Sequence, residues 1–159
     1  MEVKSRHHLR SDEVKAVTEA LADGLGVDLD ADSFELVEFK DSDFELILVD
    51  GAATVGRLDG TPFLTVRGAN DYPPERNVVT VDAGAVSFVS DGADVMRPGI
   101  VEADDSIEEG DVVAIAEETH GKVLAIGTAL TAGSDMVGDS GKVVKSIHFV
   151  GDELYNFTA

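Results

Sequence analysis

The sequence has no cysteine and no tryptophan. Without cysteine, neither a disulfide nor a thiolate-bound metal ion can stabilise the fold. No apolar run approaches the roughly 20 residues that a membrane-spanning helix requires. The opening MEVKSRHHLRSDEV also lacks the apolar segment of a secretory signal. We therefore expect a soluble protein of the cytoplasm with no membrane association.

Basic side chains are scarce as well: 12 Lys and Arg stand against 32 Asp and Glu, a formal net charge of −20. The acids are not gathered in a tail, since residues 1–79 hold 17 acids and 8 bases and residues 80–159 hold 15 acids and 4 bases. An even acidic coat repels itself unless salt screens it, and the Debye length is about 3 Å at 1 M salt. We expect a halophilic source. The alternative is simply an acidic, soluble protein.

The apolar fraction of 43% in 159 residues suffices for one ordinary domain or two small ones. Ser11, with Asp12 and Glu13 after it, predicts a helix start, and Gly24 or Gly26 predicts its end. Apolar runs between turn residues predict strands at 34–39, 44–49, 61–66, 78–81, 112–116, 123–126, 143–150 and 154–157, and a short helix at 83–90.

Turn residues and prolines indicate how these elements are grouped. Asp50-Gly51 and Asp59-Gly60 are typical of hairpin turns. Pro73-Pro74 is excluded from a helix interior or a central strand, so we expect a domain boundary beside it. The expected fold class is α+β, with residues 1–76 as a helix on a small antiparallel sheet and residues 77–159 as a small β-barrel.

Three short motifs resemble ligand sites but lack essential residues. The acidic loop that begins at Asp28 has Ser33 where a calcium loop needs glycine and Phe39 where it needs glutamate. Residues 138–142 lack the leading glycine of a phosphate loop. His7-His8 has no third ligand nearby, and adjacent side chains do not face one site. The sequence therefore predicts no metal site.

Catalytic motifs are missing too. The chain has no Gly-x-Ser-x-Gly turn and no cysteine nucleophile. With 32 acids, any pair of carboxylates could be named a catalytic dyad, so their presence carries no information. We expect a protein that is not an enzyme and needs no cofactor.

The most informative segment combines VDAGAV at 81–86, FV at 88–89, DGADVM at 91–96 and RPGI at 97–100. This order of strand, short helix, glycine turn and Pro-Gly turn resembles the signature of the PUA domain. GDVVAI at 110–115 and AIG at 125–127 are similar to its later strands. The resemblance implies an RNA groove between the signature helix and the strands near the Pro-Gly turn. Carried over to this chain, the groove residues are Gly84, Ala85, Arg97, Pro98 and Gly99.

Charge and aromatic residues add further candidates for RNA contact. Lys142 and Lys145 lie in an acid-free stretch from 140 to 150, although each lysine has an ordinary solvated role as its alternative. Phe88, Tyr72 and Tyr155 are candidates for stacking on bases, with a place in the core as the alternative.

The resemblance continues outside this segment. The opening helix, the central sheet, TPF at 61–63 with YP at 72–73, and IHFVGDELY at 147–155 are similar to the malignant T-cell amplified sequence family, which has archaeal members. That family joins a pre-PUA domain, here 1–76, to a PUA domain, here 77–159. It implies binding of tRNA or rRNA, association with the small ribosomal subunit, and a role in initiation, reinitiation or recycling. Its eukaryotic members also bind the density-regulated protein, and a similar partner is an open alternative here.

Two other functions remain as alternatives. The acidic coat is compatible with a protein-interaction module whose partner is a basic ribosomal protein or factor. PUA domains also accompany tRNA-modifying enzymes. About 75 residues precede the domain here, too few for a catalytic domain of that kind, so such an accessory protein would act in trans.

Overall fold

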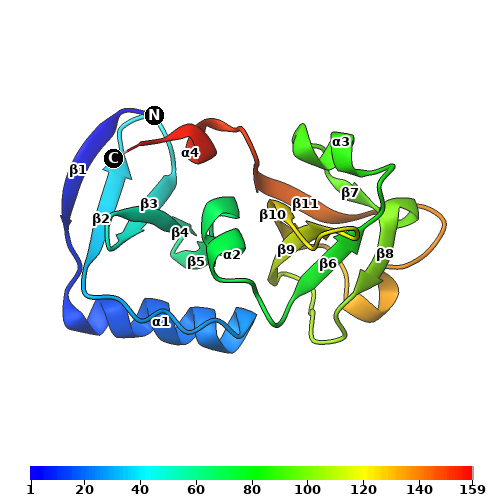
Figure 1. Ribbon diagram of the computed structural model, residues 1–159, viewed down its shortest axis with the longest axis horizontal. Coiled ribbons are helices and arrows are strands. Elements are labelled where there is room, and N and C mark those ends of the chain that lie inside the picture. Colours follow the sequence, from blue (N-terminus) through cyan, green and yellow to red (C-terminus); the bar gives the residue numbers. More distant parts are fainter. Residues whose placement is uncertain (159) are drawn as a thin grey trace.

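The computed structural model describes residues 1–158 and has two β-sheets lying side by side, one in each half of the chain (Figure 1). The first sheet has five strands and the second has six. The predicted α+β class is confirmed. Among the helices described, none has the length and apolar character needed to cross a bilayer.

The first sheet is a simple antiparallel meander with the strand order β1-β2-β3-β4-β5. Its elements, with the two helices of this half, are β1 (Val3–His8), α1 (Ser11–Leu25), β2 (Phe34–Phe39), β3 (Phe44–Val49), β4 (Ala52–Leu58), β5 (Thr61–Leu64) and α2 (Val66–Asp71). In Figure 1, α1 runs along one side of this sheet, and α2 lies between the two halves. The strands predicted at 34–39 and 44–49 are confirmed residue for residue.

The hairpin turns follow from local backbone chemistry. Asp50 and Gly51 both have positive φ, at 50° and 85°, and Asp59 and Gly60 repeat the pattern at 51° and 81°. Two consecutive positive φ values define the turn whose twist matches an antiparallel hairpin, and Asp-Gly suits it best. Both predicted turns are confirmed, and together they fix the register of β3, β4 and β5.

Helix α1 starts one residue earlier than predicted. Its cap is Arg10, and Ser11 is already helical. The Arg10 N–H donates to the Glu13 side chain at 3.2 Å, which satisfies a backbone group that would otherwise lack a partner. At the other end Gly26, with φ at 67°, closes the helix, so the second of the two predicted end residues is the correct one.

The second sheet has the order β7-β11-β10-β9-β6-β8, and all its pairings are antiparallel except β6 with β9. Its elements, with the helices around it, are β6 (Val78–Val81), α3 (Val86–Ser90), β7 (Val95–Met96), η1 (Arg97–Gly99), β8 (Ile100–Ala103), β9 (Val112–Glu117), β10 (Val123–Ala129), η2 (Gly133–Asp135), β11 (Lys142–Phe149) and α4 (Glu153–Asn156). The short helix expected at 83–90 is confined to 86–90, because a turn occupies 83–85.

The strand predicted at 154–157 is wrong: residues 154–156 belong to the helix α4, and Phe157 follows it. Leu154, Tyr155 and Phe157 favour a strand by composition. The Asp152 side chain, however, accepts a hydrogen bond from the Tyr155 N–H at 2.8 Å and caps a helix instead. The helix turns the end of the chain back over the first sheet. There the rings of Phe157 and Phe39 pack edge to face, with their centroids 5.1 Å apart.

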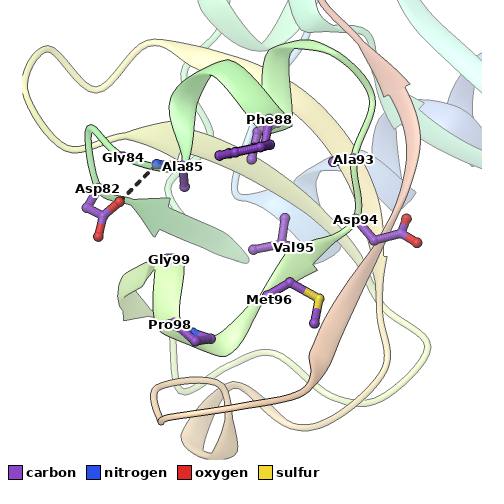
Figure 2. Close-up of a pocket in the computed structure, with 11 residues that line it drawn as sticks. Asp82, Gly84, Ala85, Phe88, Ala93, Asp94, Val95, Met96, Pro98 and Gly99 are labelled. Atoms are coloured by element: carbon purple, nitrogen blue, oxygen red, sulfur yellow. Dashed lines mark hydrogen bonds between the residues drawn. The ribbon is translucent and has the colours of Figure 1, made fainter.

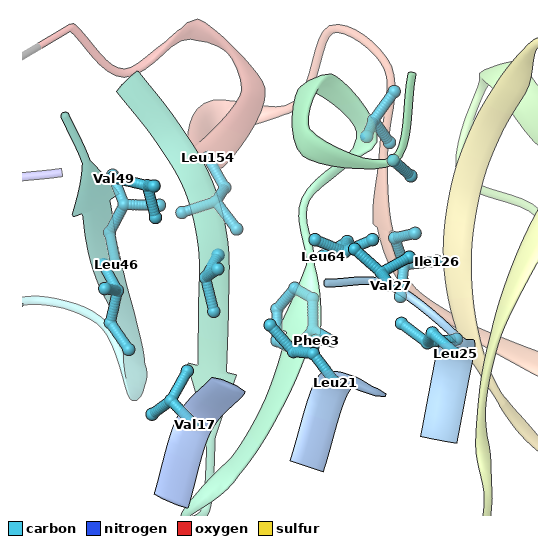
Figure 3. Close-up of a cluster of buried hydrophobic side chains, with 14 of the residues drawn as sticks. Val17, Leu21, Leu25, Val27, Leu46, Val49, Phe63, Leu64, Ile126 and Leu154 are labelled. Carbon is cyan, nitrogen blue, oxygen red and sulfur yellow. The ribbon is translucent and has the colours of Figure 1, made fainter. Parts of the chain in front are cut away.

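One hydrophobic core joins the two halves. Val17, Leu21 and Leu25 of α1 pack on the first sheet, and the same cluster continues into the second half through Ile126 and Leu154 (Figure 3). A second cluster fills the interior of the six-stranded sheet and is made of residues from 79 onward. The hydrophobic core that covers the first sheet therefore includes side chains from the second half of the chain.

Candidate functional site

A groove opens between α3 and the turn η1 on the second half of the chain (Figure 2). Its volume is about 370 Å³. The residues that line it are Asp82, Gly84, Ala85, Phe88, Val89, Ala93, Asp94, Val95, Met96, Pro98 and Gly99. Four of the five residues inferred from the sequence signature, Gly84, Ala85, Pro98 and Gly99, thus come together around one space.

Close backbone contact holds the base of the groove together. The Asp82 N–H donates to the Gly99 carbonyl at 2.9 Å, and the Asp82 carboxylate accepts from the Ala85 N–H at 3.0 Å. A Cβ at Gly99 would lie 2.9 Å from the Cβ of Ala85, so a larger residue would separate the two walls. Glycine is required at 99 for this approach. At Gly84 no positive φ or steric conflict demands it.

Phe88 is the most exposed of the large hydrophobic residues described, with 67% of its surface accessible. The other phenylalanines are buried or half-buried. Met96 is 47% exposed and lies on the opposite wall of the same groove (Figure 2). An accessible aromatic ring and a thioether beside an apolar hollow form a surface for a flat, weakly hydrated group.

The side chain of Arg97 is directed away from the groove, into the loop at 135–141. Its Nε donates to the Asp135 carbonyl at 2.9 Å and its Nη1 to the Ser140 carbonyl at 3.0 Å. A Cβ at Gly141 would lie 2.7 Å from that Nη1, so the loop closes tightly around the guanidinium. Arg97 thereby fixes a loop next to the groove and is not one of its lining residues.

Lys142 and Lys145 lie on β11, next to the wall formed by β7. Lys142 pairs with Met96 across the two strands, and its Nζ is 3.0 Å from the Asp94 carboxylate. The Ser146 N–H, at 2.8 Å, is the largest influence holding the pKa of Asp94 below its usual value; burial opposes this, and Lys142 and Lys145 reinforce it. Lys142 is thus tied to the edge of the groove by an ion pair that the sequence did not reveal, and Lys145 lies three residues further along the same strand.

The other two stacking candidates lie elsewhere. Tyr72 and Tyr155 are partly buried against the core that joins the halves. Asp94 and Met96 belong to the groove but were not predicted as site residues. The signal for Met96 was available, since it lies two residues before the Pro-Gly pair and caps η1. Within residues 1–158 no three His, Cys, Asp or Glu side chains form a group suited to a metal ion.

Residues 77–151 match the PUA domain family. An uncharacterized protein of Methanocaldococcus jannaschii is 39% identical over 99% of both chains. Translation machinery-associated protein 20 of Saccharomyces cerevisiae is 29% identical over 78% of this chain and 72% of its own. Malignant T-cell-amplified sequence 1 of Danio rerio is 29% identical over 70% of this chain and 65% of its own. The solved structure of a conserved PUA domain protein from Thermoplasma acidophilum is 32% identical, with a TM-score of 0.82 over 95% of this chain and 97% of that one.

Proposed function

Because this chain belongs to the PUA-domain proteins related to translation machinery-associated protein 20 and malignant T-cell-amplified sequence 1, we propose that it binds RNA in the translation machinery and performs no catalysis. The groove between α3 and η1 is the proposed RNA site. The finer role proposed is the handling of tRNA or of the small ribosomal subunit in initiation, reinitiation or recycling. A partner similar to the density-regulated protein would bind the first half of the chain.

The observation that carries this proposal is the exposure of Phe88 beside the groove. Leaving a phenylalanine two-thirds exposed forgoes burial energy of about 2 kcal/mol. RNA-binding proteins use such rings as platforms, since every base has a π-face to stack on them. A base stacked on Phe88 would reach Met96 and the backbone at Gly99 in the same groove.

The rim supplies limited positive charge. Lys142 already has the Asp94 carboxylate as a partner, whereas no ion pair involves Lys145 among the residues described. Each phosphate neutralised by the protein makes binding more sensitive to salt. With so few free cations at the groove, the proposed affinity rests on stacking and on close contact with the backbone, as a protein adapted to high salt would need.

The experiment is RNA binding by fluorescence anisotropy in molar potassium chloride, with the fold of each variant checked by circular dichroism. Phe88→Ala should weaken binding by about 1–3 kcal/mol, the value of one stacked base. Val101→Ala is the matched control, because Val101 is 47% exposed on β8 and does not line the groove. Equal losses from both variants would contradict a site at the groove.

Charge reversal tests the rim separately. Replacing Lys142 and Lys145 by Glu should weaken RNA binding by about 1–2 kcal/mol. Lys40→Glu, at the turn between β2 and β3, is the control and should have little effect. If no tRNA or rRNA fragment binds the wild-type chain, the alternative function, a protein-interaction module, becomes the favoured one. Pull-down of basic ribosomal proteins would then be the next measurement.

A further inference from the structure

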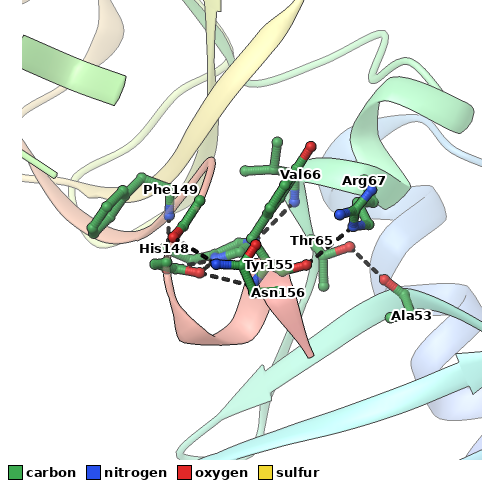
Figure 4. A network of polar contacts seen from close by, with 10 residues as sticks. Ala53, Thr65, Val66, Arg67, His148, Phe149, Tyr155 and Asn156 are labelled. Carbon is green, nitrogen blue, oxygen red and sulfur yellow. Dashed lines mark hydrogen bonds and ion pairs between the residues drawn. The ribbon is translucent and has the colours of Figure 1, made fainter. Parts of the chain in front are cut away.

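Arg67, at the start of α2, is held in one orientation by the C-terminal helix. Its guanidinium carbon lies 3.9 Å from the centre of the Tyr155 ring, and its Nε donates to the Tyr155 carbonyl at 3.1 Å (Figure 4). These contacts use one face and one edge of the guanidinium. The two terminal nitrogens, Nη1 and Nη2, have no hydrogen-bond acceptor among the residues described.

Four of the other five arginines of this acidic chain have partners for their side chains, and Arg76 is the exception among the residues described. Arg6, Arg10 and Arg57 each form an ion pair with one or two carboxylates. Arg97 is bound to loop carbonyls. Arg67 is exposed and rigidly placed, yet no carboxylate of residues 1–158 lies within ion-pair distance of it. The protein therefore presents a fixed donor fork to solvent at the junction of its two halves.

A cleft with further positive charge lies one helical turn along α2. Asn70 bridges the halves there, because its side chain accepts from the Val123 N–H at 2.8 Å and donates to the Val123 carbonyl at 3.0 Å. The cleft has a volume of about 410 Å³, and Asn70, Pro73, His120 and Lys122 are among its lining residues. Arg67 and Asn70, three residues apart on one helix, face the same side.

The turn that carries His120 and Lys122 is preorganised. The Glu117 carboxylate accepts hydrogen bonds from the N–H groups of Thr119, His120 and Lys122, at 3.1, 2.8 and 2.9 Å. The Glu117 charge is thereby engaged with the backbone. The Lys122 Nζ forms no ion pair with the acids that the structure describes. The turn therefore fixes the backbone of Lys122 at the edge of the cleft.

We propose that Arg67 and Lys122 bind the phosphodiester backbone of a second stretch of RNA, separate from the nucleotides in the groove between α3 and η1. This inference rests on the proposed RNA-binding function. A guanidinium fork binds two phosphate oxygens at once, and one that is already ordered loses little side-chain entropy when it does so. Where salt suppresses long-range attraction, such preordered contacts are the ones that still contribute to affinity.

The test measures RNA affinity by anisotropy over a salt range of about 0.5–2 M, with Arg67→Gln and Lys122→Gln compared with wild type. The slope of log K against log salt is negative. Each lost phosphate contact should make it less steep by about 0.7, the value for a single strand. Arg67→Gln should also weaken binding about ten-fold, because a charge-assisted bidentate contact is removed. Arg10→Gln is the matched control, since Arg10 is exposed but already paired with Asp12 and Glu13.

Arg67→Lys keeps the positive charge but removes the guanidinium geometry, so it tests the two contributions separately. It should keep the wild-type salt slope and still lose affinity, because an ammonium group cannot form the bidentate contact. An unchanged slope and affinity in Arg67→Gln, with Phe88→Ala still impaired, would overturn this inference alone. Absence of RNA binding by the wild-type chain would overturn the proposed function as well. If polyglutamate binds in an Arg67-dependent way and RNA does not, the surface belongs to an acidic protein partner.

Discussion

The ring Nε2 of His148 accepts a hydrogen bond of 3.0 Å from the backbone N–H of Val66, 82 residues earlier in the chain. A backbone N–H can only donate, so Nε2 must be the acceptor, and the ring proton lies on Nδ1. Nδ1 contacts the Asp152 carboxylate at 2.8 Å. The ring is fully buried and Asp152 is half-buried, so this chain of polar groups crosses the interface between the halves largely shielded from water. It fixes the start of α2 relative to β11.

Replacement of His148 by Phe should destabilise the whole chain by about 3 kcal/mol, because the Val66 N–H and the Asp152 carboxylate lose a buried partner. Urea unfolding in molar potassium chloride measures the loss. His7→Phe, at an exposed position of β1, is the control and should change stability by no more than about 0.5 kcal/mol. Equal stability of the two variants would show that the His148 bridge contributes nothing.

The Asp152 carboxylate should make the free energy of unfolding depend on pH. Burial alone would raise its pKa, but hydrogen bonds from His148 and from the N–H groups of Tyr155 and Phe149 outweigh burial and lower the pKa below the usual 3.8. A carboxyl with a lowered pKa in the folded state stabilises that state above its unfolded pKa. The contribution is lost as the pH falls through the folded value.

Asp152→Asn tests this relation. The difference in unfolding free energy between wild type and variant should be about 1 kcal/mol and constant from pH 7 to pH 5. It should narrow below about pH 4, as Asp152 becomes protonated. Urea titrations at each pH measure the difference. A difference in unfolding free energy that grows as the pH falls would contradict the lowered pKa of Asp152.

A fragment of residues 77–159 should be less stable than the intact chain. We propose residue 76 as the boundary of two domains, but Ala114, Ala116, Val123 and Ile126 are buried in the core they share with α1 and the first sheet. Removal of residues 1–76 would expose these side chains and leave His148 without Val66. Thermal unfolding followed by circular dichroism compares the two. A fragment that melts with or above the full chain would refute the prediction.

The fold should depend on salt. The net charge of −20 on 159 residues repels itself, and salt screens that repulsion. Circular dichroism from molar potassium chloride to dilute buffer should show progressive loss of structure, and sodium chloride should protect in the same way. A native spectrum in dilute buffer would remove the argument for a halophilic source.

Features with local causes could be predicted from the sequence. The Asp-Gly hairpins follow from the backbone freedom of two residues, and α1 follows from apolar residues at helical spacing. The walls of the groove were inferred from the resemblance to the PUA signature, and the structure adds a local physical reason for one of these residues. That residue is Gly99, which lies against Ala85.

Elements that the apolar pattern of the sequence does not show were missed. The strand β1, with the sequence VKSRHH, has no apolar alternation and forms because β2 offers it an edge to pair with. The helix α2 follows Thr65, whose side chain caps it, where the sequence predicts a strand that continues to residue 66. The helix α4 depends on Asp152, which His148 orients from the neighbouring strand. Of these three elements, β1 alone depends on a distant partner, since it pairs with β2. The caps of α2 and α4 are hydrogen bonds between residues three positions apart, which apolar periodicity does not reveal.

The sequence by itself determined the acidic coat, the turns and the order of residues around the groove, because composition and backbone preference are local properties. Only the tertiary structure decided which of the few cations are free. Strand β7 pairs with β11 and brings Asp94 to Lys142, while a loop closes around Arg97. Arg67, which attracted no notice in the sequence, is ordered by Tyr155 from the far end of the chain. Electrostatic and hydrogen-bond energies depend on distance in space, and the separation of residues along the chain does not report that distance.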